Sequence, residues 1–102
     1  MLREQLFSID VTDDAHVLIV APIGELDLTT SPQLVETFAS RRDDHRALIC
    51  DVTGVTFMDS TGIQALIWLA DAEPQRFALA GTSQPVERLL DLTSTAHRFQ
   101  RV

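Results

Sequence analysis

Lysine is absent from the 102-residue sequence: all eight positive side chains are arginines, against 15 acidic residues, and the formal charge is −7. A P-loop uses a lysine to hold nucleotide phosphates, so the sequence contains no P-loop. A receiver domain also needs a lysine near the carboxyl edge of its sheet, which argues against Asp51 as a phospho-accepting aspartate. The arginines are scattered rather than gathered into a basic patch, and we therefore expect neither nucleic acid nor an anionic membrane as a partner.

Cysteine and long apolar runs are also scarce. Cys50 is the single cysteine, which excludes an internal disulfide framework and a cysteine metal site. No apolar stretch approaches the length of a membrane-spanning helix, and the first ten residues lack a signal-peptide core. The histidines at positions 16, 45 and 97 are too far apart to predict a metal cluster or a catalytic triad. These patterns predict a cytoplasmic protein without cofactor or metal.

Apolar periodicity predicts one small α/β domain over residues 1–102. Hydrophobic residues make up 45% and charged residues 23%, which is typical of a globular domain. The predicted strands are residues 7–11, 16–20, 47–52 and 76–80, with a weak fifth at 98–102, and three helices begin near Ser31, Ser60 and Ser83. Strands separated by helices pair in parallel, and the opening hairpin is antiparallel. We expect a small mixed sheet of four to five strands with helices mainly on one face.

Turn-forming and capping residues mark the ends of these elements. Pro22 and Gly24 are expected to break or bend the far end of the second strand. Ser31 is the expected cap of the first helix, because Pro32 then takes the first helical position. The second helix is expected to fade near Asp71.

The most distinctive local feature is Asp59-Ser60-Thr61-Gly62, directly before an apolar run. Helix capping explains the hydroxyls, since Thr61 with Gln64 matches the capping box and Ser60 is an alternative cap. Capping does not explain Gly62, because glycine in the first turn costs about 1 kcal/mol relative to alanine. We expect another group to approach the backbone closely at this glycine.

The helix that follows this motif is apolar around too much of its circumference. One stripe is enough to pack on a sheet, and Ala65, Trp68 and Leu69 fall partly outside it. Such a surplus often marks a binding surface, unless another helix covers it. A hydroxyl beside that surface suits a phosphorylation switch, because phosphate adds about −1.5 to −2 charge and is costly in an apolar interface. Unpaired N–H groups at the helix start would accept the phosphate without breaking the fold.

Enzyme motifs are incomplete here. The hydrolase elbow G-x-S-x-G lacks its first glycine, because Met58 stands in that place. Aspartic proteases carry D-S-G or D-T-G, whereas this chain has the longer D-S-T-G. A small hydrolase using Asp27, Asp51 and Asp59 is a third hypothesis, but no nucleophile, base and orienting group converge in the motifs. Asp51 is better explained as the polar end of a buried strand, and we predict a binding protein with no catalytic residue.

Three blocks of the sequence carry a family resemblance. They are GELDLTTSPQL at 24–34, LICDVTGVTFMDSTGIQALIWL at 48–69, and LAGTSQPVERLLDL at 79–92. With these blocks the chain resembles the STAS domain, specifically the single-domain anti-sigma factor antagonists of bacteria. The resemblance covers nearly the whole chain and implies a small β-sheet backed by helices.

The resemblance also implies a mechanism. The serine of D-S-[ST]-G in that family is phosphorylated by an anti-sigma factor that is itself a serine kinase, which places the modification at Ser60. The unphosphorylated chain would bind the anti-sigma factor and free the sigma factor, and a PP2C-type phosphatase would reverse the modification. Nucleotide and magnesium would belong to the kinase. The expected partner-binding residues are Asp27, Asp59, Ser60, Thr61, Gly62 and Gln64.

Two alternatives remain open within this resemblance. Relatives with the same fold serve in transporters and signalling complexes, so a non-phosphorylated adaptor subunit is the second hypothesis. Ser60 favours the phosphorylated branch. Thr61 is expected to be a helix cap rather than a second phosphorylation target.

Overall fold

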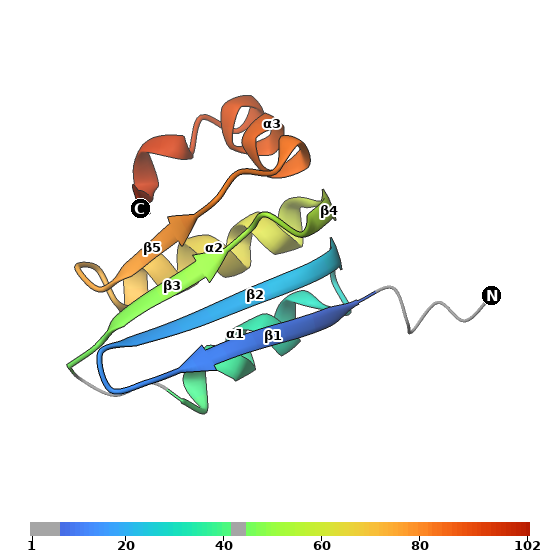
Figure 1. Ribbon diagram of the computed structural model, residues 1–102. Helices are drawn as coiled ribbons and strands as arrows, with labels where there is room; N and C mark the ends of the chain where they lie inside the picture. Colours follow the sequence, from blue (N-terminus) through green and yellow to red (C-terminus); the bar gives the residue numbers. More distant parts are fainter. Residues whose placement is uncertain (1–6, 42–44) are drawn as a thin grey trace.

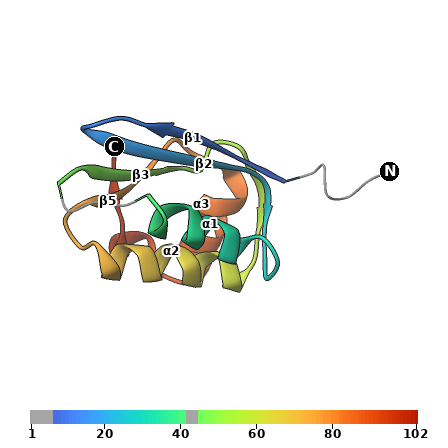
Figure 2. The ribbon, with the colours of Figure 1, turned by 90° about the horizontal axis from the view of Figure 1, so that it is seen from below.

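A mixed sheet with helices on one side makes up residues 7–41 and 45–102, which this computed structural model describes (Figure 1). In chain order the elements are β1 (Ser8–Asp13), β2 (Val17–Leu26), α1 (Ser31–Ala39), β3 (Ala47–Asp51), β4 (Val55–Met58), α2 (Ser60–Ala72), β5 (Phe77–Ala80), α3 (Gln84–Leu92), the 3₁₀ turn η2 (Ala96–Arg98) and β6 (Gln100–Arg101). Figure 2 shows α1 and α2 stacked along one face of the sheet. The predicted α/β class is therefore confirmed.

Strand β2 organises the sheet because it is ten residues long and has three partners. It pairs antiparallel with β1, while its residues 17–20 pair in parallel with β3 and its residues 24–26 pair in parallel with β4. The predicted strand ends too early, at residue 20. Pro22 lies between the two parallel pairings, and at Gly24, whose φ is 112°, the register with β4 shifts. The strand thus bends at these residues and continues to Leu26.

The remaining strands follow the order β1-β2-β3-β5-β6, with β4 attached to β2 outside this path. Within the described residues the sheet has six strands where four to five are expected from the sequence, and the addition is β4. The inner two of its four residues are exposed and the outer two are buried, so it shows no period-two alternation. Only the long-range pairing with β2 makes this segment a strand. It ends directly before Asp59, which makes it important for the candidate site.

The helices are short and lie close to their predicted positions. The longest, α2, has 13 residues and ends at Ala72, one residue beyond the predicted Asp71. Within residues 7–41 and 45–102, no helix is long and apolar enough to cross a bilayer.

The core lies between the sheet and the helices. Its buried side chains come from β2, β3 and β5 (Leu18, Val20, Leu48, Cys50, Phe77 and Leu79) and from the helices (Leu34, Phe38, Leu66 and Leu90). The rings of Phe38 and Phe77 meet edge to face, with centroids 5.6 Å apart. Burial raises the pKa of the Cys50 thiol, so this cysteine is an inert core residue.

Candidate functional site

Two aspartates follow adjacent strand ends. Leu26 of β2 and Met58 of β4 are paired in parallel, and the next residues are Asp27 and Asp59. The backbone N–H of Asp59 donates to the carbonyl of Leu26 at 3.3 Å, which ties the two strand ends together. Crevices at the carboxyl ends of parallel strands are common binding sites in α/β proteins. Two motifs that are distant in the sequence therefore meet at one edge of the sheet.

Asp59 is the cap of α2. Its backbone is extended (φ −109°, ψ −170°), and its carboxylate accepts from the N–H groups of Thr61 at 2.9 Å and Gly62 at 3.3 Å. The Thr61 hydroxyl donates to the same carboxylate oxygen. The predicted capping box of Thr61 and Gln64 is wrong, and so is Ser60 as the cap. Asp59, one residue before Ser60, supplies a carboxylate that accepts from these N–H groups, and a carboxylate is a stronger acceptor than a hydroxyl.

The charge of Asp59 is held in place by these contacts. The hydrogen bond from the Thr61 hydroxyl is the main cause that lowers the pKa of Asp59, and the Gly62 and Thr61 amides add to it, against a partial burial that raises it. Asp59 is therefore a carboxylate at neutral pH. The N–H groups of Thr61 and Gly62 are already occupied by it, so the expectation that they are unpaired is wrong.

Ser60 is the first residue of α2 and is exposed. Within the described part of the chain its hydroxyl has no hydrogen-bond partner, whereas the neighbouring Thr61 hydroxyl is engaged by Asp59. A modifying enzyme would meet the Ser60 hydroxyl directly. This difference supports the prediction that Ser60 is a modification site and Thr61 a structural residue.

Gly62 is buried where α2 begins against the strand ends. A Cβ atom at this position would lie 2.5 Å from Cγ of Met58 and 2.9 Å from the carbonyl oxygen of Leu26. The prediction of a close backbone approach is confirmed, and the approaching groups belong to the core. Gly62 thus sets how closely the first turn of α2 packs on β2 and β4.

Asp27 forms a second turn, before α1. Its carboxylate accepts from the N–H groups of Thr29 at 3.0 Å and Thr30 at 3.1 Å. The Thr30 hydroxyl accepts from the Asp27 N–H and lies 2.7 Å from the Glu25 carbonyl, to which it donates. Thr30 occupies the N-cap position of α1, so the prediction that Ser31 is the cap is wrong.

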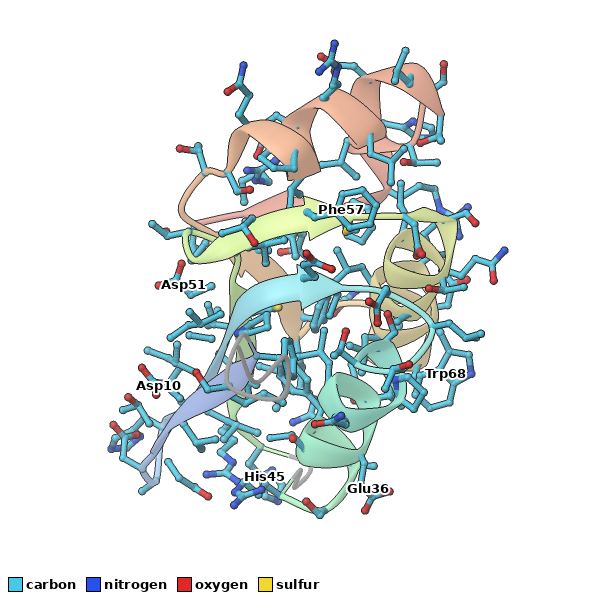
Figure 3. The ribbon with its side chains drawn as sticks, turned by 90° about the vertical axis from the view of Figure 1, so that its right-hand side faces the viewer. Asp10, Glu36, His45, Asp51, Phe57 and Trp68 are labelled. Atoms are coloured by element: carbon cyan, nitrogen blue, oxygen red, sulfur yellow. The ribbon has the colours of Figure 1, made fainter. Side chains whose placement is uncertain are left out.

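An apolar groove of about 480 Å³ runs between α1 and α2 beside this edge. We call it the α1–α2 groove; it is lined by Leu28, Ser31, Pro32, Val35, Glu36, Thr61, Gln64, Ala65 and Trp68. Leu28 is 73% exposed and Trp68 is 55% exposed. Figure 3 shows Trp68 and Glu36 at the surface on one side of the molecule.

The predicted apolar surplus of α2 is therefore real, although not every member contributes. Leu69 is buried in the core, Ala65 is half-buried, and Trp68 is exposed. Leu28 was not among the predicted site residues. Its signal in the sequence is a large apolar residue directly after the aspartate of a turn, where a polar residue is usual.

Asp51 lies away from this edge. Its carboxylate accepts from the N–H and hydroxyl of Thr53, so it closes the turn after β3. Figure 3 shows it on the opposite side of the molecule from Trp68. No group of three or more His, Cys, Asp or Glu side chains that could hold a metal ion occurs in residues 7–41 and 45–102.

Comparison with known protein families identifies the family of this chain. The family model of the STAS domain matches residues 8–101. The chain belongs to the STAS domain family. No curated protein sequence matches it significantly.

Solved structures of anti-sigma factor antagonists have a similar fold over most of the chain. An anti-sigma factor antagonist from Mycobacterium paratuberculosis has a TM-score of 0.80 at 24% identity, covering 93% of this chain and 84% of that one. An anti-sigma-factor antagonist (STAS) domain protein from Planctomyces limnophilus has a TM-score of 0.72 at 25% identity, covering 91% and 87%. The anti-sigma factor antagonist SpoIIAA, unphosphorylated, has a TM-score of 0.72 at 16% identity, covering 94% and 87%; the Bacillus protein also matches in its phosphorylated form.

Proposed function

We propose that this STAS domain is a cytoplasmic anti-sigma factor antagonist, switched by phosphorylation of Ser60. In the unphosphorylated state it binds an anti-sigma factor that is also a serine kinase, and so frees a sigma factor. A PP2C-type phosphatase restores the binding state. The observation that carries the proposal is the exposed Ser60 hydroxyl, between the hydrogen-bonded carboxylate of Asp59 and Thr61, which lines an apolar groove.

The α1–α2 groove suits the docking of a partner. Leu28 and Trp68 are large, exposed apolar side chains that line it, and tryptophan is a residue type that often contributes much of the binding energy of an interface. Thr61 and Gln64 line the groove on α2, and Asp27 positions the loop that carries Leu28. We assign this surface to the anti-sigma factor, with Thr61 and Gln64 in its lining and Asp27, Asp59, Ser60 and Gly62 in the two turns beside it.

Phosphorylation would close this surface by electrostatics. A phosphate on Ser60 brings about −1.5 to −2 charge next to the Asp59 carboxylate. Because Asp59 already binds the N–H groups of Thr61 and Gly62, the phosphate has few donors on α2 and adds to a negative cluster. Burial of that cluster in an interface is unfavourable, and a hundredfold loss of affinity corresponds to about 2.8 kcal/mol.

The first test is phosphate mapping. The protein is incubated with its cognate anti-sigma factor and Mg-ATP, and the modified residue is located by tandem mass spectrometry. We expect phosphate on Ser60, none after Ser60→Ala, and retained phosphorylation after Thr61→Ser, which keeps a hydroxyl for the Asp59 contact. Phosphate on Thr61, or none at all, would refute the proposed site.

The second test is partner affinity by titration calorimetry. Ser60→Ala should bind within about twofold of the unmodified protein, and Ser60→Asp about tenfold or more weakly, because it adds one charge beside Asp59. Trp68, the single tryptophan, supplies a second readout, since burial in the interface should shift its emission to shorter wavelength. Equal affinities for Ser60→Ala and Ser60→Asp would contradict the switch.

A non-phosphorylated adaptor role is not favoured. The solved structures described above are anti-sigma factor antagonists, and each match covers most of both chains. The exposed Ser60 hydroxyl also has no hydrogen-bond partner among the described residues, so an adaptor would have no structural need to keep it.

A further inference from the structure

A second apolar groove lies on another part of the surface, between β4 and α3. We call it the β4–α3 groove; it has a volume of about 360 Å³ and is lined by Thr56, Phe57, Met58, Gln84, Pro85, Arg88, Leu89 and Leu92. Phe57 is 48% exposed and Leu92 is 74% exposed. Figure 3 shows Phe57 between β4 and α3, well separated from Trp68. This groove shares no lining residue with the α1–α2 groove.

Helix α3 presents two apolar stripes, and the core needs only one. Val86 and Leu90 are fully buried. Pro85, Leu89 and Leu92, at spacings of three and four residues, line the groove, and of these Leu89 is half-buried and also packs against the core. A nine-residue helix with a spare apolar stripe next to an exposed phenylalanine is more apolar than folding requires.

Arg88 distinguishes this groove electrostatically. The other arginines of the described segments form ion pairs: Arg41 and Arg46 with Asp13, Arg76 with Glu73, Arg98 with Asp71, and Arg101 with Glu87. Arg88 is exposed, and no carboxylate of the described part of the chain lies within 4.0 Å of it. In a chain of charge −7 an unpaired arginine inside an apolar groove is a specific attraction for an acid.

We propose that the β4–α3 groove binds an acidic, apolar segment of another protein. Its apolar side chains contact Phe57 and Leu92, and one carboxylate pairs with Arg88. The inference does not depend on Ser60 phosphorylation, since it rests on groove residues that play no part in the proposed switch.

The test uses two synthetic amphipathic peptides of about 12 residues, which is roughly three helical turns. Both carry the same leucine stripe, and the remaining positions are glutamate in one and lysine in the other. Titration into ¹⁵N-labelled protein should shift the amide signals of residues 56–58 and 84–92 with the glutamate peptide. The lysine peptide should bind more weakly.

Charge reversal separates the proposal from non-specific apolar binding. Arg88→Glu should weaken the glutamate peptide about tenfold and strengthen the lysine peptide. Leu92→Ser should weaken both. Arg98→Glu, at a paired arginine outside the groove, should change neither by more than about twofold. Unchanged amide dispersion verifies that each variant is folded.

Three results would overturn the proposal. The first is a glutamate-peptide signal confined to the α1–α2 groove, and the second is the same peptide preference before and after Arg88→Glu. The third is self-association in sedimentation that Leu92→Ser abolishes, which would make a second copy the occupant.

Discussion

The turns at Asp27 and Asp59 have the same hydrogen-bond pattern but present different residues at the surface. In each, one carboxylate oxygen accepts from the N–H groups two and three residues later. In each, the residue directly after the aspartate projects into solvent: Leu28 after Asp27 and Ser60 after Asp59. In these two turns the residue after the aspartate is therefore displayed at the surface, and its type decides whether the turn offers an apolar anchor or a modifiable hydroxyl.

The two turns differ in how they join their helices. After Asp59 the helix begins at once. Gly62 lies three residues after Asp59 and packs closely against the Leu26 carbonyl. After Asp27 the helix begins later, and Thr30 at the same distance keeps a side chain whose hydroxyl binds the backbone. The Asp59 turn thus adds close packing at Gly62 to its hydrogen bonds, whereas the Asp27 turn adds the hydrogen bonds of the Thr30 hydroxyl.

Gly62→Ala should have the largest effect on stability. Alanine favours a helix, but its Cβ would meet the Leu26 carbonyl and Met58, and we expect the free energy of unfolding to fall by about 1–3 kcal/mol. Urea unfolding measures this. Gln64→Ala, at an exposed position of the same helix, is the control and should change stability by less than about 0.5 kcal/mol. An unfolding midpoint for Gly62→Ala equal to that of the parent protein would show that the contact is not limiting.

Removal of either turn carboxylate should have the next largest effect on the free energy of unfolding, and the two effects should be unequal. Asp59→Ala removes the helix cap and should cost about 1–2 kcal/mol. Asp27→Ala should cost less, about 1 kcal/mol, because the Thr30 hydroxyl still joins the Asp27 N–H to the Glu25 carbonyl. If Asp27→Ala proved the more destabilising in urea unfolding, the first turn would depend on its carboxylate more than its contacts indicate.

The Asp59 turn should also have a smaller effect on how stability depends on pH. The folded state lowers the pKa of Asp59, chiefly through the Thr61 hydroxyl, so its stabilisation is complete above the ordinary aspartate pKa of about 3.9. That stabilisation is lost as the pH falls through the lower folded value. Between about pH 5 and pH 2, Asp59→Asn should therefore lose less stability than the parent protein.

Asp14 provides the comparison for this titration. Its pKa is also lowered, by the N–H groups of His16 and Val17. Asp14→Asn should therefore remove a separate part of the stability that the parent protein loses in acid. Identical acid profiles for Asp59→Asn and the parent, from unfolding curves at several pH values, would mean that the Asp59 turn does not titrate with folding.

The displayed residues themselves should matter least to folding. Leu28→Ser and Ser60→Ala replace exposed side chains, and each should change the free energy of unfolding by less than about 0.5 kcal/mol. Their effects on partner affinity should diverge, with about a tenfold loss for Leu28→Ser and almost none for Ser60→Ala. A folding defect in either variant would assign the side chain a structural task.

The Asp59–Gly62 motif could be predicted as the candidate site because its signals are local. A run of acid, two hydroxyls and glycine before an apolar helix stands in consecutive residues, and the position of α2 follows from its apolar pattern. The choice of cap could not be predicted, since Asp59, Ser60 and Thr61 are all good capping residues. Only the backbone conformation of Asp59 decides which of them reaches the free N–H groups.

Local sequence alone determined the α/β class, the helix starts and the motif at Ser60, because apolar period and capping chemistry act over a few residues. Tertiary structure decided the rest. The pairing of β2 with β4 made residues 55–58 a strand and brought Asp27 beside Asp59. It also decided which apolar residues were left outside the core, because exposure of Leu28, Trp68, Phe57 and Leu92 depends on what packs around them. Contacts between distant segments leave no periodic trace in the sequence, so they appear only when the chain is folded.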